Sequence, residues 1–220
     1  MTLRQNYDEQ LLELQSMVTR MGGIATEMVR SACAAIQTGD LENARATIER
    51  DNEVDELEEQ ITLKAVVLVM KESPVAGDLK MLTSALGVVG EIEKAADHAV
   101  KLARRATKLT GQFPAELKTN LAELAELSIK QFTLSLKLFM DFDGDLAEEI
   151  IRNDKVVDEL YTVARNRVIE LIRKSPESAD VYVRSIDALH ALEHVADHAT
   201  EIAERLRLHF SNLARLAREN

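Results

Sequence analysis

The chain contains the stretch Glu93-Lys94-Ala95-Ala96-Asp97-His98-Ala99, and about 100 residues later a close copy of it, Glu193-His194-Val195-Ala196-Asp197-His198-Ala199. Each stretch carries two carboxylates at positions i and i+4. Another acidic pair with this spacing lies upstream of each stretch, at Asp51 and Asp55 and at Asp154 and Asp158. On a helix this spacing places both carboxylates on one face, about 5–6 Å apart at Cβ. Like charges placed in this way repel, so the repeated pattern predicts a cation between them.

The composition predicts a helical chain with a sizeable core. Of its 220 residues, 46% are apolar, and only 8 are Gly and 3 are Pro. Few helix breakers, together with abundant Ala, Leu, Glu, Lys and Arg, are typical of an all-α protein. The net charge of −11 argues against nucleic acid as a partner, because there is no excess of Lys and Arg to displace counterions.

The N-terminal residues, the short apolar runs and the single cysteine predict a cytoplasmic protein. Charged residues at Arg4, Asp8 and Glu9 precede any apolar run, which is unlike a signal peptide. The apolar run at 65–70 is too short to span a bilayer. Cys33 cannot form an intramolecular disulfide, and its alanine neighbours predict a small buried residue.

Helix breakers divide the chain into six long helical pieces. They lie at Gly39-Asp40, Ser73-Pro74, 111–114, 143–145 and Ser175-Pro176, with Ser as N-cap and Pro as first helical residue in the two Ser-Pro turns. No segment alternates with a period of two residues, so we expect no strands. The breakers and the acidic pairs repeat together. We therefore predict a tandem pair of antiparallel three-helix bundles, spanning residues 1–111 and 112–220, related by a pseudo-two-fold internal repeat.

The helical pieces show two further details, one in their matching motifs and one in the apolar pattern of the first piece. Gly39-Asp40-Leu41 resembles Gly144-Asp145-Leu146, and this match places a two-residue gap between the halves before the Asp pairs. In the first piece the apolar seam Leu11, Leu14, Val18, Met21, Ala25, Met28, Ala32, Ala35 alternates steps of three and four. Gly22-Gly23 interrupts this seam and predicts a bend or a close helix contact.

The acidic pairs lie on the packing stripes or directly beside them. The stripe through Leu41, Ala44 and Ile48 leads to Asp51, and the stripe from Leu79 leads to Glu93. Because helices joined by a tight turn are antiparallel neighbours, the two pairs of each half should come level. We expect one metal site per half, formed by Asp51, Asp55, Glu93 and Asp97 and by Asp154, Asp158, Glu193 and Asp197. The ion would be Fe, Zn, Mn, Mg or Ca; solvated charges or salt bridges to Lys and Arg are the alternatives.

Histidines lie within and just before the second acidic stretch, at helical spacing. His190, His194 and His198 recur every four residues, and His98 corresponds to His198. His98, His194 and His198 are candidate additional ligands or outer-shell groups of the acidic sites. Residues 190–194 also spell the H-x-x-E-H pattern of inverted zinc peptidases, but no third ligand is apparent and the first half has no counterpart. No His follows a Glu by three residues, which disfavours a ferritin-like di-iron site.

These sequence motifs resemble those of the PhoU family, the phosphate-signalling regulators of bacteria. The resemblance rests on the paired acidic words, on Pro74-Val75-Ala76-Gly77-Asp78-Leu79-Lys80 and on the Ala-Asp-His-Ala ending of each half, and it covers essentially the whole chain. The family word Glu-Arg-Ile-Gly-Asp-His has lost its Arg here, where Lys94 and His194 stand. The stretch 180–184 is a loose version of the run at 74–80.

The resemblance implies a cytoplasmic, dimeric adaptor. Proteins of this family connect the phosphate ABC transporter, through its ATPase, with a membrane sensor histidine kinase, and they repress the phosphate-starvation response. They can bind metal clusters through the acidic words. Such a protein reaches the membrane only through its partners.

The sequence leaves three classes of function to be distinguished. The first is the phosphate-regulatory adaptor, with an accessory protein of a low-affinity phosphate permease as its close variant. The second is a carboxylate-bridged metalloenzyme, which we do not expect because the sequence shows no set of nucleophile, base and orienting group. The third is a metal-storage or purely structural helical protein.

Overall fold

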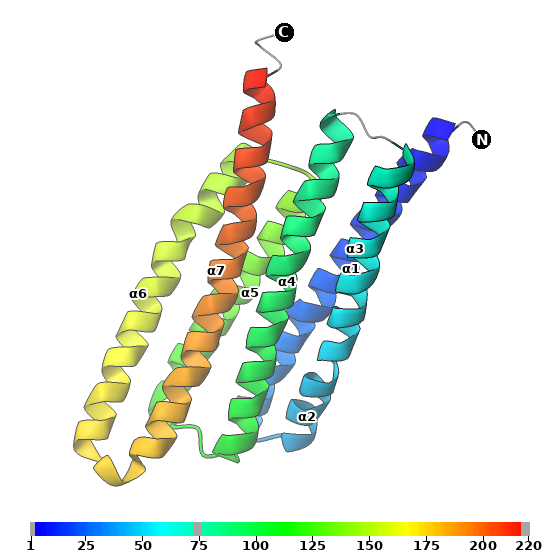
Figure 1. The fold of residues 1–220 in the computed structure, drawn as a ribbon. Helices are drawn as coiled ribbons and strands as arrows, with labels where there is room; N and C mark the ends of the chain where they lie inside the picture. Colours follow the sequence, from blue (N-terminus) through cyan, green and yellow to red (C-terminus); the bar gives the residue numbers. More distant parts are fainter. Residues whose placement is uncertain (1–2, 73–75, 217–220) are drawn as a thin grey trace.

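The computed structural model describes residues 3–72 and 76–216, and within them the only regular secondary structure is helical. The first half contains α1 (Leu3–Thr38), α2 (Leu41–Glu49), α3 (Asp51–Glu72) and α4 (Ala76–Leu109). The second contains α5 (Lys118–Met140), α6 (Gly144–Lys174) and α7 (Ala179–Leu216), with short 3-10 turns at Ala115–Leu117 and Pro176–Ser178. The helices run alternately up and down, except that α2 and α3 follow one another in the same direction (Figure 1). This confirms the predicted all-α tandem of six helical pieces, the second of which is interrupted at Arg50.

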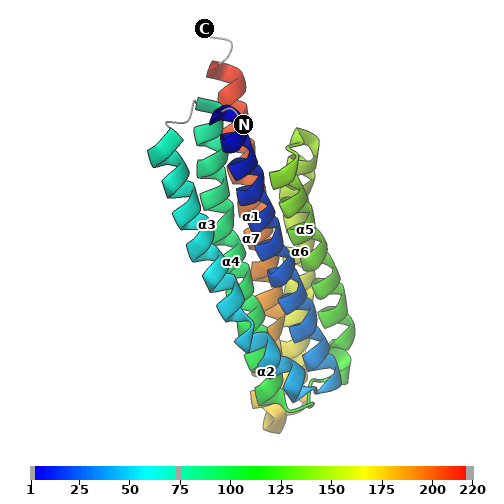
Figure 2. The ribbon, with the colours of Figure 1, turned by 90° about the vertical axis from the view of Figure 1, so that its right-hand side faces the viewer.

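Four helices form a central ring. α1 packs on α4, α4 on α7, α7 on α5 and α5 on α1. α3 packs against both α1 and α4, and α6 packs against both α5 and α7. Seen from the side, α3 and α5 lie at opposite edges of the bundle (Figure 2). The two repeats therefore share a broad contact, and their buried apolar side chains form one continuous cluster. None of the described helices has an apolar stretch long enough to cross a membrane.

The predicted seam of α1 is buried as expected. Every member from Leu14 to Ala35 is at most 1% exposed, while Leu11 is partly buried. The Gly22-Gly23 step does not end the helix. A Cβ atom on Gly22 would lie 2.6 Å from Leu136 Cδ1, so this glycine marks a close approach of α1 to α5.

Capping residues, and not the similar Gly-Asp-Leu words, set the register of the repeat. Asp40 caps α2 by accepting a hydrogen bond from the Asn43 N–H at 3.0 Å. In the second half the cap is Asp143, which accepts from the N–H groups of Asp145 and Leu146. The pair Asp51 and Asp55 lies as many residues after Asp40 as the pair Asp154 and Asp158 lies after Asp143. The predicted two-residue gap was wrong, because Gly39 precedes its cap at φ 75° whereas Gly144 is inside its helix.

Both Ser-Pro turns were predicted to begin a helix, with Ser as N-cap and Pro as first helical residue. Ser73 and Pro74 lie outside the described residues. At the second turn Ser175 makes no capping hydrogen bond through its side chain, and Pro176 starts a short 3-10 turn instead of α7. Ser175 and Pro176 thus have the predicted N-cap and first positions, but they begin this short turn and not the long helix.

The buried stripes of α3 and α4 run beside the predicted acidic residues. On α3 the buried residues Val54, Leu57 and Ile61 continue the core, and Asp51 and Asp55 flank them. Leu79, expected on the stripe of α4, is 41% exposed. The acidic pairs thus lie at the edge of the core, where carboxylates keep access to solvent and to ions.

Candidate metal sites and the seam between the repeats

The first acidic group lies where α3 faces α4. Asp51 and Asp55 project from α3, and Glu93 and Asp97 project from α4, as the spacing predicts. Burial raises the pKa of Asp51, and the charges of Asp55 and Asp97 raise it further. Burial, followed by Asp97 and Glu58, raises the pKa of Glu93. These four carboxylates therefore share one electrostatic environment, although no three of them bring their oxygens within 4.8 Å of one another.

The second acidic group is tighter. Asp154 and Asp158 of α6 and Asp197 of α7 bring one oxygen each to within 4.8 Å of the other two. Burial raises the pKa of Asp154, while a 2.9 Å hydrogen bond donated by Thr200 Oγ1 opposes that change. Three converging carboxylates form an oxygen-rich set of the kind that binds hard cations such as Mg²⁺, Mn²⁺ and Ca²⁺.

Glu193, expected in this second group, instead meets two histidines of its own helix. Its Oε2 lies 3.4 Å from His190 Nε2 and 3.9 Å from His194 Nδ1. Burial, followed by the charge of Asp197, raises the pKa of the Glu193 carboxyl to about 7. This oxygen is buried and accepts no hydrogen bond from the described residues.

The histidines of both repeats gather where α4 meets α7. The ring centroid of His98 lies 4.7 Å from that of His194 and 5.4 Å from that of His198. Burial and the neighbouring Lys101 lower the pKa of His98 to about 3, and its Nδ1 is buried without a hydrogen-bond partner among the described residues. His98, His194 and His198 thus lie on the seam between the repeats, and His190 joins them through His194.

Glu91 is a residue of this seam that sequence reasoning missed. Its side chain is 6% exposed, and one carboxylate oxygen lies 2.9 Å from His198 Nδ1. The other oxygen lies 3.1 Å from Lys94 Nζ and 3.5 Å from Arg205 Nη2. A signal was present, because Glu91 falls on the three-and-four spacing of the buried residues Ser84, Val88 and Ala95.

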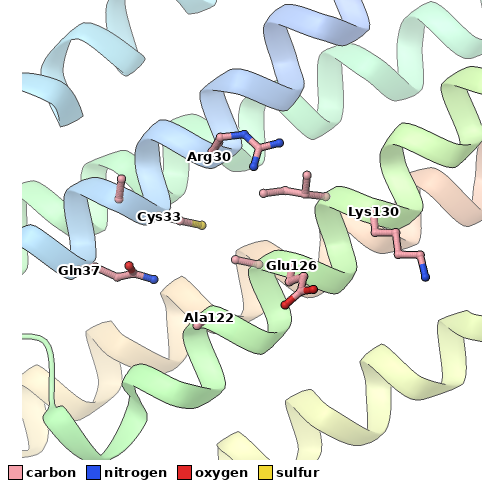
Figure 3. A pocket seen from close by; sticks show the side chains of 9 residues that line it. Arg30, Cys33, Gln37, Ala122, Glu126 and Lys130 are labelled. Atoms are coloured by element: carbon pink, nitrogen blue, oxygen red, sulfur yellow. The ribbon is translucent and has the colours of Figure 1, made fainter.

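A separate groove of about 400 Å³ lies between α1 and α5. In the ring of helices, this contact is opposite the contact of α4 with α7. Figure 3 shows the side chains that line the groove. Arg30, Glu126 and Lys130 lie at its edges, and Cys33 faces into it. Cys33 is only 4% exposed, and burial raises the pKa of its thiol to about 12. A thiol that stays protonated is a poor nucleophile and a poor metal ligand, which agrees with the structural role predicted for Cys33.

Comparison with known proteins agrees with both the repeat and the fold. The PhoU domain matches residues 18–106 and again residues 121–206. The "Phosphate-specific transport system accessory protein PhoU homolog" of Rhizobium meliloti is 28% identical over 91% of this chain and 85% of its own length. The crystal structure of PhoU from Pseudomonas aeruginosa is 27% identical and superposes with a TM-score of 0.88, over 94% of this chain and 99% of the other.

A second solved structure shows the same fold at lower identity. The phosphate transport system regulatory protein PhoU from Streptococcus pneumoniae is 24% identical, with a TM-score of 0.86 over 94% of this chain and 97% of its own. The two matched segments contain both copies of the acidic stretch that suggested the resemblance. The chain belongs to the PhoU family, as a tandem of two PhoU domains.

Proposed function

We propose that this protein is a cytoplasmic negative regulator of phosphate uptake and of the phosphate-starvation response. As a member of the PhoU family it is an accessory or regulatory protein and not an enzyme. The observation that supports the regulatory role is the match of both repeats to the PhoU domain, together with whole-length similarity to phosphate-specific transport system accessory proteins. In this proposal a homodimer docks on the ATPase of the phosphate ABC transporter and on a sensor histidine kinase.

The regulatory role predicts a phosphate-dependent phenotype. A host strain that lacks its own PhoU protein, carrying an empty vector, should express alkaline phosphatase constitutively in high phosphate. The same strain carrying this gene should repress phosphatase in high phosphate and release that repression in low phosphate. Phosphatase activity at the two phosphate concentrations is the measurement, and equal amounts of the protein must be verified by immunoblot.

An outcome without repression would contradict the signalling role. If phosphatase stays constitutive while uptake through a low-affinity phosphate permease changes, the protein is an accessory of that permease. If neither changes, metal binding or storage is the better account.

We further propose that the acidic groups bind hard metal ions, one group per repeat, with the repeats spanning residues 1–111 and 112–220. The ligands are Asp51, Asp55, Glu93 and Asp97 in the first group, and Asp154, Asp158 and Asp197 in the second, to which Glu193 lies close. Support comes from the convergence of three carboxylates in the second group. The pKa values of Asp51, Glu93 and Asp154 agree with this proposal, because burial raises them first and neighbouring carboxylates raise them further.

Neutralising two carboxylates of the second group should raise the stability of the metal-free protein and lower the stabilisation that a bound metal ion provides. The double variant Asp154→Asn/Asp158→Asn removes a repelling pair, so the metal-free protein should gain about 0.2–0.5 kcal/mol in its free energy of unfolding. The same change should weaken Mn²⁺ binding by at least about tenfold, as the loss of even outer-shell groups does. Calorimetric titration of chelator-treated protein and thermal unfolding in both conditions are the measurements.

A matched control removes the same charge from the same helix. Asp145→Asn/Glu149→Gln neutralises another i,i+4 pair on α6, outside both acidic groups, and should leave Mn²⁺ affinity unchanged. A gain in stability without any loss of Mn²⁺ affinity in the Asp154/Asp158 variant would identify these residues as solvated charges.

A further inference from the structure

The seam between the repeats contains a polar cavity that the phosphate role does not use. It has a volume of about 180 Å³ and lies between α4 and α7. Its polar lining consists of His98, Lys101 and Arg105 from the first repeat and Asp187, His190 and His194 from the second. A space of this size holds an ion together with a few water molecules, since one water occupies about 30 Å³ in the liquid.

Beside this cavity, three donor groups have the spacing of metal ligands. His190, Glu193 and His194 each offer one atom, and these atoms all lie within 4.8 Å of one another. The distance of 3.4 Å between His190 Nε2 and Glu193 Oε2 is close to the edge of a zinc tetrahedron. Bonds of about 2.0–2.1 Å place neighbouring ligands about 3.3–3.4 Å apart. The arrangement therefore needs little movement to accept an ion.

Two buried polar atoms near the cavity have no hydrogen-bond partner in the described part of the chain. Glu193 Oε2 and His98 Nδ1 are both buried and form no hydrogen bond with the described residues. Leaving such atoms unpaired costs about 1–3 kcal/mol each, and a bound ion is one of the partners that such atoms take in proteins. The two atoms belong to different repeats, and both side chains lie beside the ring of His194.

We propose that this seam is a binding site for one divalent transition-metal ion of the zinc class, held by His190, Glu193 and His194 of α7 and completed by His98 of α4. Imidazole nitrogens suit Zn²⁺, Co²⁺ and Ni²⁺, whereas the all-carboxylate groups suit Mg²⁺, Mn²⁺ and Ca²⁺. The donor set of this site thus differs from that of the acidic groups, although Asp197 of the second group contacts His194, and the site links the two repeats. It does not depend on the proposed regulatory role.

Neighbouring charges permit a cation at this position. The two cationic side chains of the cavity are already paired, Arg105 with Asp187 at 2.9 Å and Lys101 with Asp97 at 4.0 Å. Asp197 Oδ2 lies 2.9 Å from His194 Nδ1 and orients that ring, which is a common role of carboxylates next to metal-binding histidines. The His190 side chain is 48% exposed, which leaves a path for the ion from solvent.

The test uses Co²⁺ as a spectroscopic probe and Zn²⁺ as its competitor. Chelator-treated full-length protein should bind one Co²⁺ at the seam, in addition to any Co²⁺ in the acidic groups. This ion should have the intense visible absorption of a four-coordinate ion, and Zn²⁺ should remove that absorption. His190→Ala should weaken Zn²⁺ binding by more than about 100-fold, because it removes a ligand and not only an outer-shell group. His98→Ala should weaken it as well and should reduce the rise in Tm that Zn²⁺ produces.

Two controls separate this site from the rest of the molecule. His209→Ala removes a histidine of the same helix pair, whose ring contacts Ser84 and not the cavity, and should bind Zn²⁺ normally. Asp158→Asn, in the acidic group, should also retain the four-coordinate Co²⁺ spectrum. Ring ¹⁵N–¹H spectra of the unmodified protein avoid dependence on any variant, since Zn²⁺ should shift the signals of His98, His190 and His194 and leave His209 unchanged.

Several results would overturn the proposal. They are a Co²⁺ spectrum of a six-coordinate ion only, unchanged Zn²⁺ affinity in a folded His190→Ala variant, or loss of binding in Asp158→Asn with retention in His190→Ala. Ring spectra in which Zn²⁺ shifts none of the three seam histidines would overturn it equally.

Discussion

Replacing Phe132 by Ala is expected to lower the free energy of unfolding by about 3–5 kcal/mol. Phe132 lies on α5 and is the largest of the fully buried side chains, with none of its surface exposed. Its removal loses the transfer free energy of the ring and leaves a cavity that rigid helices fill only in part. Because a protein of this kind has a total stability of about 5–15 kcal/mol, the change should be visible as a large fall in the urea midpoint.

The same variant tests whether the repeats unfold together. The buried apolar side chains of both halves form one cluster, so we expect a single unfolding transition by far-ultraviolet circular dichroism. Phe132→Leu should cost clearly less than Phe132→Ala. Val163→Ala, at a position 59% exposed, should change stability by no more than about 0.5 kcal/mol. Two transitions, with only one of them shifted by Phe132→Ala, would show that the repeats are energetically independent.

Replacing Glu91 by Ala should cost about 2–3 kcal/mol in metal-free buffer. The main loss is at His198, whose side chain is 15% exposed and whose Nδ1 loses its partner at 2.9 Å. Lys94 and Arg205 contribute less, because their side chains are 54% and 42% exposed and can turn to water. Urea unfolding of the variant and of His198→Ala, combined in a double-mutant cycle, measures the coupling of the pair.

An exposed ion pair provides the control for Glu91. Glu148 lies 2.6 Å from Arg207, with side chains 58% and 39% exposed, and Glu148→Ala should cost less than about 1 kcal/mol. Glu91→Gln should cost less than Glu91→Ala, because an amide oxygen still accepts a hydrogen bond from His198. If Glu91→Ala were as mild as Glu148→Ala, the seam would owe its stability to apolar packing alone.

Local signals in the chain were enough to predict the helices and their order. The apolar stripe of α1 from Leu14 to Ala35 repeats at helical spacing. Gly39, Gly111 and Pro176 lie at or beside helix ends. Such signals act within a few residues, so they can be read without knowing the partner helix. The sequence also predicted that the two acidic pairs of each half lie at the same height, across α3 and α4 and across α6 and α7. This prediction was possible because tight turns make consecutive helices antiparallel neighbours.

Only the tertiary structure decided how the two repeats meet. Periodicity identifies the buried face of a helix but does not say which distant helix covers it, and α4 and α7 are far apart along the chain. The contact of Glu91 with His198 and the gathering of His98 with His194 follow from that packing. The sequence by itself thus determined the six helical pieces and the helix faces on which their acidic motifs lie. Packing of α4 on α7 determined the histidine seam, because side chains from separate helices converge only when the core that they flank has formed.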